Sequence, residues 1–233
     1  MNIIIGHSVL GRPIHAYHVG DHSENQIIIT GAIHAREWIT ELLVKELLHM
    51  YSVNDFGKGG IWFVPLCNPD GVEIAMKEKP LWKANARGVD LNVNFDAEWG
   101  RGAQNVRKAG SENYIGTHPE SEPEVKALID FTMKVKPKMT IAYHSKGEVI
   151  YYKYDRDLWL AKKVGEVTGY APIKTKDSTG GYSDWVAMHL KIPALTIEVG
   201  NDDYTHPIGA EKLPEILEQN KIVPKLLLSL LVF

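Results

Sequence analysis

The chain has little of what would mark a secreted, membrane-bound or nucleic-acid-binding protein. It has one cysteine, Cys67, among 233 residues, so no disulfide can form within the chain. Its net charge is −3 and it has no basic run, which argues against a nucleic-acid partner. The apolar runs at residues 3–5 and 226–233 are too short for a secretory signal or a bilayer span. We therefore expect a cytoplasmic protein with no membrane partner.

Repeats, low-complexity tracts and Pro/Gly-rich linkers are also absent, which favours a single domain over residues 1–233. Strand-like and helix-like patterns alternate along the chain. Strands are expected in a hairpin at 3–20 and at 25–34, 60–66, 139–144, 147–154 and 193–200. Helices are expected at 36–51, 121–136, 155–170, 181–190 and 211–233, the last interrupted at Pro224. This alternation predicts an α/β fold, a doubly wound and mostly parallel sheet with helices on both faces.

Three local patterns give further expectations. The stretch GVDLNVNFD at 88–96 alternates strictly between apolar and polar residues, so an extended strand is predicted there. The tetrapeptide NPDG at 68–71 is typical of a turn that stops a strand. Ser121 followed by Glu124 has the spacing of a capping box at a helix start.

Several residues with suitable chemistry fall at the carboxyl ends of expected strands, where open α/β sheets bind ligands. They are His34, His144 and Glu198, and Glu37 follows His34 in the first turn of a helix. Two histidines and a glutamate form a known ligand set for catalytic zinc. Each residue also has an ordinary structural explanation, such as a helix-dipole partner for Glu37 or an ion pair for Glu198.

Taken together, the motifs resemble the zinc carboxypeptidase family, and the resemblance covers nearly the whole chain. They occur in the family's order as GHSVLGRPI, GAIHAREW, CNPDG, GVDLNVNFDAEWG, YIGTHPESEPE, YHSKGE, GGYSDW and TIEVG. The resemblance implies a single domain with a mixed sheet of about eight strands. It assigns His34, Glu37 and His144 to one Zn²⁺ per chain and Glu198 to the general base that activates water at the metal. We also expect no propeptide region before the domain in this chain.

The residue that would stabilise the oxyanion is less clear from the resemblance. The digestive members of the family have an arginine after a tryptophan where this chain has Trp82 and Lys83. We favour Arg87 for the role, because a guanidinium keeps its charge and can bond an oxyanion with two nitrogen donors. Lys83 stays the alternative.

The chain departs from the family where a carboxypeptidase holds the substrate's free carboxylate. The family has Asn-Arg-Asn there, whereas this chain has Asn92-Val93-Asn94. Asn92 can still donate a hydrogen bond, but valine cannot pair with a carboxylate. The family's mobile tyrosine falls on Lys176, for which Tyr182 is a candidate replacement, and Lys146 replaces a tyrosine near the second zinc histidine.

These departures fit a bacterial branch of the family, the γ-D-glutamyl–diamino acid peptidases, which cut peptidoglycan stem peptides next to diaminopimelate or lysine. We therefore expect a peptidoglycan peptide substrate, with Lys146 or Arg87 near the D-Glu carboxylate. The alternative is a carboxypeptidase that uses another cation, such as Lys146 or Arg101. A related zinc deacylase and a metal-binding module without catalysis are further readings, which the full motif set and Glu198 disfavour.

Overall fold

One mixed sheet of eight strands runs through the centre of the molecule. The structure is a computed structural model and describes residues 1–23, 25–52 and 59–231. The sheet order is β1-β2-β4-β3-β5-β8-β6-β7. The strands are β1 (Asn2–His7), β2 (Pro13–Gly20), β3 (Gln26–Thr30), β4 (Gly60–Val64), β5 (Met139–His144), β6 (Val149–Tyr152), β7 (Ala171–Lys174) and β8 (Ala194–Glu198). The central strands β4, β3, β5 and β8 are parallel to one another, whereas β2 joins β4 and β6 joins β8 antiparallel. The expected mixed eight-stranded sheet is confirmed.

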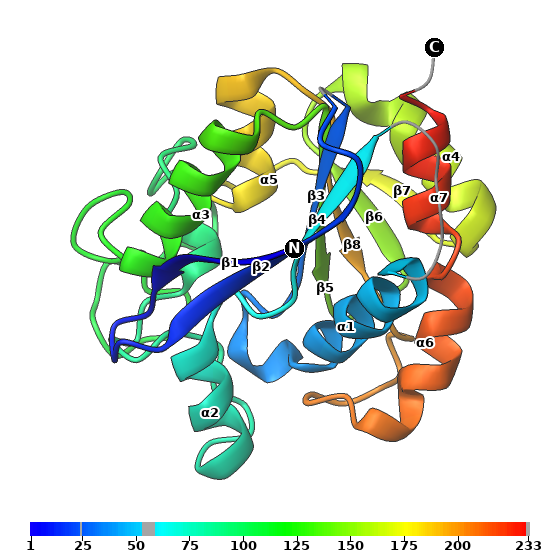
Figure 1. The fold of residues 1–233 in the computed structure, drawn as a ribbon. Coiled ribbons are helices and arrows are strands. Elements are labelled where there is room, and N and C mark those ends of the chain that lie inside the picture. The colour runs from blue at the N-terminus through cyan, green and yellow to red at the C-terminus, as the bar shows by residue number, and fades with distance from the viewer. Residues whose placement is uncertain (24, 53–58, 232–233) are drawn as a thin grey trace.

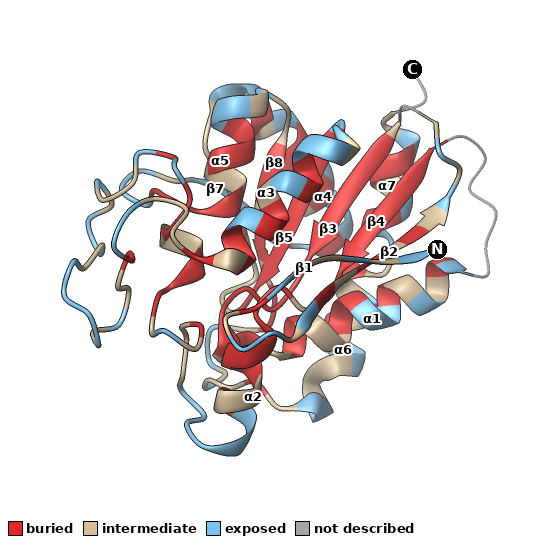
Figure 2. Ribbon diagram, turned by 60° about the vertical axis from the view of Figure 1, so that its left-hand side comes forward, coloured by how far each residue is buried: buried red, intermediate tan, exposed pale blue. Residues whose placement is uncertain are grey.

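Helices cover both faces of the sheet, as Figure 1 shows. On one face pack α1 (Ile39–Ser52), α4 (Leu158–Thr168), α6 (Leu213–Asn220) and α7 (Val223–Ser229). On the other pack α3 (Pro123–Val135) and α5 (Tyr182–Trp185), the latter continued by a π-helical turn at Val186–Leu190. In β3, Ile27 and Ile29 face the first layer and Ile28 the second, as the alternation of side chains along a strand requires. Figure 2 shows the residues of the central strands coloured as buried.

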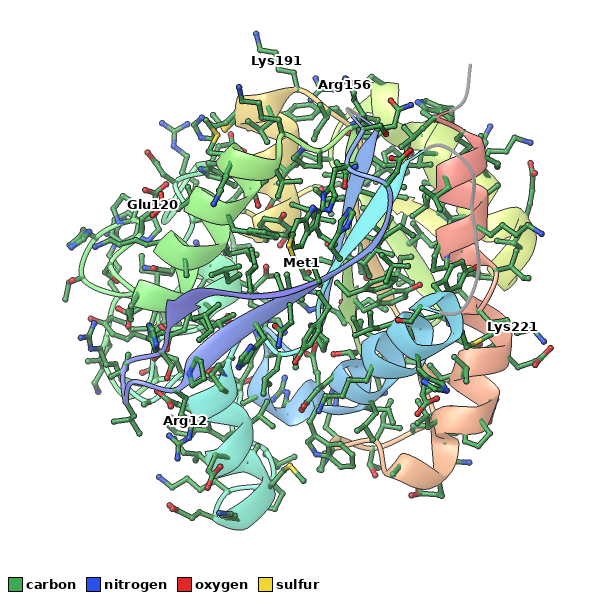
Figure 3. All side chains as sticks on the ribbon, viewed as in Figure 1. Met1, Arg12, Glu120, Arg156, Lys191 and Lys221 are labelled. Atoms are coloured by element: carbon green, nitrogen blue, oxygen red, sulfur yellow. The ribbon has the colours of Figure 1, made fainter. Side chains whose placement is uncertain are left out.

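The hairpin of β1 and β2 is tied to α2 (Pro69–Lys77), a helix that the sequence did not predict. The NPDG turn opens this helix, because the Asn68 side chain accepts a hydrogen bond from the Gly71 N–H at 3.0 Å and Pro69 suits a first turn. Arg12 lies beside α2 in Figure 3, and its guanidinium is 2.7 Å from Asp70 Oδ1. The prediction of a turn alone at 68–71 is therefore wrong.

The predicted strand at 88–96 is also wrong. Leu91–Val93 form a short 3₁₀ helix within a loop, and the Asp90 side chain accepts a hydrogen bond from the Asn92 N–H at 3.0 Å. The backbone of the loop bonds elsewhere: Asp90 N–H donates to Tyr114 O, and Phe95 N–H donates to Gly180 O. Within residues 1–23, 25–52 and 59–231, no strand pairs with this loop, so the apolar–polar alternation belongs to an irregular segment.

Smaller differences concern element ends. Helix α3 begins at Pro123 with Glu122 as its cap, and Glu124 accepts from Val9 N–H instead of completing a capping box with Ser121. The last predicted helix is two helices, α6 and α7, with the break at residues 221–222 just before Pro224. Residues 232–233 of that prediction lie outside the described part of the chain. Among the described residues, no helix has both the length and the apolar character needed to cross a membrane.

Candidate active site

His34 and Glu37 meet because the chain turns sharply after β3. The carbonyl oxygens of Thr40 and Pro65 lie only 2.7 Å and 3.0 Å from where a Cβ on Gly31 would stand, so this position needs glycine. Thr40 Oγ1 accepts from the Ala32 N–H at 2.8 Å and fixes the turn. A 3₁₀ turn at Ala35–Glu37 then brings Glu37 Oε1 to 2.8 Å from His34 Nδ1.

His144 completes the cluster from the end of β5, the strand beside β3. Its Nδ1 lies 3.2 Å from His34 Nδ1 and 3.1 Å from Glu37 Oε2. All three side chains are buried, and one donor atom from each lies within 4.8 Å of the others. The structure thus brings together the three residues that the sequence proposed as metal ligands.

The electrostatics of this cluster suit a cation. Two imidazole Nδ1 atoms face each other at 3.2 Å, a contact that needs a proton or a metal ion between them. Burial alone would lower the pKa of His34, but the carboxylates of Glu37 and Asp90 raise it to about 9. Burial opposes ionisation of Glu37 as well, yet the two histidines hold its pKa well below its usual range. Nitrogen and oxygen donors in this 2:1 ratio fit zinc.

Asp90 is the residue of the site that the sequence analysis missed. Its Oδ1 lies 3.1 Å from His34 Nε2, so it can accept a hydrogen bond from the Nε2–H and leave the Nδ1 lone pair of His34 for a metal. Asp90 is buried, which disfavours its charge, but His34 and Lys83 keep its pKa well below its usual range. The available signal was the acidic residue within GVDLN, inside the segment 88–96 that we took as a strand.

Glu198 ends β8 directly opposite His144, with which it is in register across the parallel pair. Within the described part of the chain its carboxylate has no hydrogen-bond or ion-pair partner, and it lines a cavity shared with His34 and His144. Burial, and then the charge of Glu37, raise the pKa of Glu198 to about 8. This is the environment expected of a carboxylate that exchanges protons.

The cavity has a volume of about 690 Å³ and extends from the metal-binding cluster toward α5 and the segment that leads to it. Asn92 and Val93 form part of its wall. Their position is fixed by α5, because Asn92 Oδ1 accepts from the Tyr182 N–H at 3.1 Å. Gly180 lies against Val93, with a φ of +87° and with Val93 O only 2.9 Å from where a Cβ would stand. Asn92 is therefore at the cavity, as the sequence proposed.

Of the two cations proposed for the oxyanion, the structure brings Lys83 to the cavity and leaves Arg87 outside it. Lys83 lines the cavity, with its Nζ 2.7 Å from Asp90 Oδ2 and 2.6 Å from Asn113 Oδ1. The Arg87 side chain is 54% exposed and lies 3.5 Å from Glu122. The Arg87 guanidinium pairs with the buried Glu122 carboxylate and does not line the cavity, so the preference for Arg87 has no support in the geometry.

Two other proposed substrate-binding residues point elsewhere. Lys146 pairs with Asp202, 2.9 Å from Oδ1, and does not line the cavity. Tyr182 is fully buried, packs against Phe95 and bonds Thr132 Oγ1 through its hydroxyl at 2.9 Å. Lys176, in contrast, does line the cavity. The cavity wall therefore differs from the one that the sequence predicted at Lys146 and Tyr182.

Comparison with curated proteins places the chain among zinc peptidases. A family profile described as zinc carboxypeptidase matches residues 2–166. The chain is 29% identical over 255 residues to gamma-D-glutamyl-L-diamino acid endopeptidase 1 of Lysinibacillus sphaericus, covering 92% of this chain and 64% of that one. It is 27% identical over 174 residues to mast cell carboxypeptidase A of Homo sapiens, covering 65% of this chain and 41% of that one. The chain thus spans less than two thirds of these relatives.

Solved structures show the same fold. Bovine thrombin-activatable fibrinolysis inhibitor, bound to a tick carboxypeptidase inhibitor, matches with a TM-score of 0.87 and 23% identity, covering 100% of this chain and 90% of that one. Murein-tripeptide amidase MpaA from Escherichia coli O157 matches with a TM-score of 0.72 and 22% identity, covering 100% and 92%. The profile match extends over more than half of the sequence, and the family's motifs meet at one cavity. The chain belongs to the zinc carboxypeptidase family.

Proposed function

We propose that this chain is a zinc-dependent peptidase that hydrolyses the γ-D-glutamyl–diamino acid bond of peptidoglycan stem peptides. The metal would be one Zn²⁺ per chain, held by His34, Glu37 and His144, whose donor atoms converge in a buried cluster. Similarity to the Lysinibacillus sphaericus endopeptidase over 92% of this chain supports the substrate class. The fold likeness to a murein-tripeptide amidase is consistent with it.

When bound, Zn²⁺ supplies a Lewis acid for the scissile carbonyl and lowers the pKa of water. The chain's own residues do the rest. Glu198, free of partners at the cavity wall, takes a proton from the attacking water and returns it to the leaving amine. Lys83 lies at the same cavity with its ammonium fixed by Asp90 and Asn113, where it can stabilise negative charge on the carbonyl oxygen. Asp90 keeps His34 in the orientation and tautomer that a ligand needs.

The observation that carries the substrate proposal is Val93. It lines the cavity beside Asn92, at the position where the family's carboxypeptidases hold an arginine for the free terminal carboxylate. An apolar side chain there offers no counter-charge, so an ordinary peptide terminus loses a bidentate ion pair. A peptidase for a γ-linked stem peptide does not need that anchor.

A second candidate is a metallocarboxypeptidase, favoured by one observation. Lys176 lines the same cavity and carries a charge that can meet a terminal carboxylate from a different direction. Several relatives are carboxypeptidases by name, including that of Homo sapiens. The two candidates differ in which peptides they cleave.

The experiment is incubation of the zinc-loaded protein with L-Ala-γ-D-Glu-meso-diaminopimelate-D-Ala, its lysine counterpart and ordinary L-peptides, read by mass spectrometry. Cleavage after γ-D-Glu, with the L-peptides intact, is the expected result. Release of single C-terminal residues from L-peptides, with intact stem peptides, would show a carboxypeptidase. A Val93→Arg variant should gain carboxypeptidase activity, whereas Val93→Met, a long but uncharged replacement, should not.

A further inference from the structure

The end of the cavity away from the metal-binding cluster carries charges of both signs. Asp184 reaches it from α5, and Lys174, Lys176 and Asp177 reach it from β7 and the segment that follows. These four charged residues have no role in the catalytic step proposed above. They line the part of the cavity that a substrate residue next to the scissile bond would fill.

Asp184 is the least exposed of these charges, with 13% of its side chain accessible. Its Oδ2 accepts from the Gly181 N–H at 3.2 Å, and its Oδ1 lies 3.8 Å from Lys153 Nζ. Lys153 is closer to Glu98, at 3.2 Å, and also donates to Ser178 O at 3.0 Å. The single ammonium of Lys153 thus pairs with two carboxylates, those of Glu98 and Asp184. These three side chains together lack one positive charge.

The titration of Asp184 agrees with this shortage. Its pKa is raised to about 6, chiefly by burial and to a smaller extent by the charge of Glu98, and Lys153 and the Gly181 N–H offset this rise only in part. A ligand ammonium at Oδ1 would supply the missing charge, because opposite charges interact strongly in a partly desolvated pocket.

Lys176, unlike Lys153, is not paired with a carboxylate of the described part of the chain. It is exposed at the cavity, and no ion-pair or hydrogen-bond partner occurs for it among residues 1–23, 25–52 and 59–231. Lys174, two residues earlier, differs in pairing with Asp155 at 2.7 Å. The Lys153 ammonium contacts both Ser178 and Asp184, so the segment that carries Lys176 runs close to the Asp184 carboxylate.

We propose that this end of the cavity binds the zwitterionic side chain of a diamino acid, with Asp184 taking its ammonium and Lys176 the carboxylate on the same carbon. Diaminopimelate has both groups and lysine has only the ammonium, so the site selects diaminopimelate over lysine. The inference rests on the proposed function and names its substrate more closely. The γ-D-glutamyl residue has a free carboxylate but no ammonium, so it could pair with Lys176 but not with Asp184. The diamino acid fits both charges and is therefore assigned to this end.

The test is calorimetric binding of three Nα-acetyl amino acid amides to the zinc-loaded protein: those of meso-diaminopimelate (blocked at its L centre only), L-lysine and L-norleucine. The blocking groups remove the α-ammonium and α-carboxylate that all three free amino acids share. Norleucine has an apolar side chain of nearly the length of lysine and serves as the uncharged reference. Diaminopimelate should bind tightest and norleucine weakest, with lysine about tenfold tighter than norleucine, the factor typical of one charge-assisted hydrogen bond. Diaminopimelate should bind about two- to fivefold tighter than lysine. This difference in affinity is small because an ion pair with the exposed Lys176 contributes little free energy.

Three variants assign these differences. Asp184→Asn keeps the acceptor for Gly181 but removes the charge, and should abolish the advantage of lysine over norleucine. Lys176→Gln should abolish only the advantage of diaminopimelate over lysine. Lys174→Gln, the matched control, should change neither ratio. Equal binding of all three amino acids to the unaltered protein, or an equal loss for all three in Asp184→Asn, would overturn the proposal.

Peptide cleavage measured in parallel separates this inference from the proposed function. Selective binding of diaminopimelate without hydrolysis of stem peptides would keep the subsite and reject the peptidase assignment. Hydrolysis of diaminopimelate and lysine peptides at equal kcat/KM would keep the peptidase and reject the subsite.

Discussion

The two ends of the cavity are built differently. At the metal-binding end, His144 and Glu198 stand opposite each other on paired strands, and His34 follows the neighbouring strand by four residues. The far end is formed by the turn at Leu91–Val93 and by residues 173–184, which are mostly loop. Sheet register fixes the position of a side chain at a strand end, whereas the direction of a loop side chain depends on distant hydrogen bonds. The first end is therefore the more predictable from sequence, and the second is where substrate choice can vary.

Replacement of the base should produce the largest effect and tests the metal-binding end directly. Glu198→Gln removes the group that moves the proton but keeps the size of the side chain, so kcat should fall by about 10²- to 10⁴-fold. Bound zinc, measured by elemental analysis, should be unchanged, because Glu198 is not among the clustered ligands. Glu166→Gln, an exposed change on α4, is the control. Full hydrolysis by zinc-loaded Glu198→Gln would exclude the assigned role.

The next effect distinguishes the two candidate oxyanion cations. Lys83→Met should lower kcat/KM by about 10²- to 10³-fold, as loss of an oxyanion donor does. Arg87→Met should leave kcat/KM within about twofold, because the Arg87 side chain is exposed and pairs with Glu122 outside the cavity. Steady-state kinetics on the same stem peptide compares them. The reverse order of effects would restore Arg87 to the role that the sequence favoured.

A smaller effect concerns the support of the metal ligands. Asp90→Asn keeps the shape of the side chain but weakens the hold on His34 Nε2–H, so zinc affinity should fall by about 10- to 100-fold. Competition with a chelator measures the affinity without any substrate. Asp130→Asn, on the exposed side of α3, is the matched control. Unchanged zinc affinity in Asp90→Asn would show that Asp90 positions Lys83 but does not support the metal ligand His34.

These contrasts explain which parts of the site the sequence could predict. The sequence predicted the three strand-end residues because their positions follow from the expected strands; these are His34, His144 and Glu198. Glu37 was predicted from its three-residue spacing after His34. Asp90 was hidden by the alternation at 88–96, which looked like a strand although its backbone bonds to Tyr114 and Gly180 across the fold. Lys146 and Tyr182 were assigned from motif position, but Asp202 and Thr132 direct their side chains away.

The fold shows the same division. The buried strands β3, β4, β5 and β8 were predicted because continuous apolar runs leave few alternatives. Strand β7 was not, since all four residues of Ala171–Lys174 are exposed and show no alternation that would reveal the pairing with β6. Helix α2 was missed because Pro69 and Gly71 look like turn residues unless the cap at Asn68 is seen.

The smallest expected effect tests whether Tyr182 belongs to the core or to the cavity. Thr132 Oγ1 already donates to Leu128 O, so the Tyr182 hydroxyl is the donor in the contact with Thr132. Tyr182→Phe should lower the free energy of unfolding by about 1 kcal/mol, the usual net value of such a bond. Urea unfolding of Tyr182→Phe, Thr132→Val and the double variant gives the coupling between the two hydroxyls. The kinetic constants for stem peptides should stay the same in Tyr182→Phe, because the hydroxyl is buried away from the cavity. A selective rise in KM without a loss of stability would instead place Tyr182 at the substrate and make the far end of the cavity mobile enough to expose it.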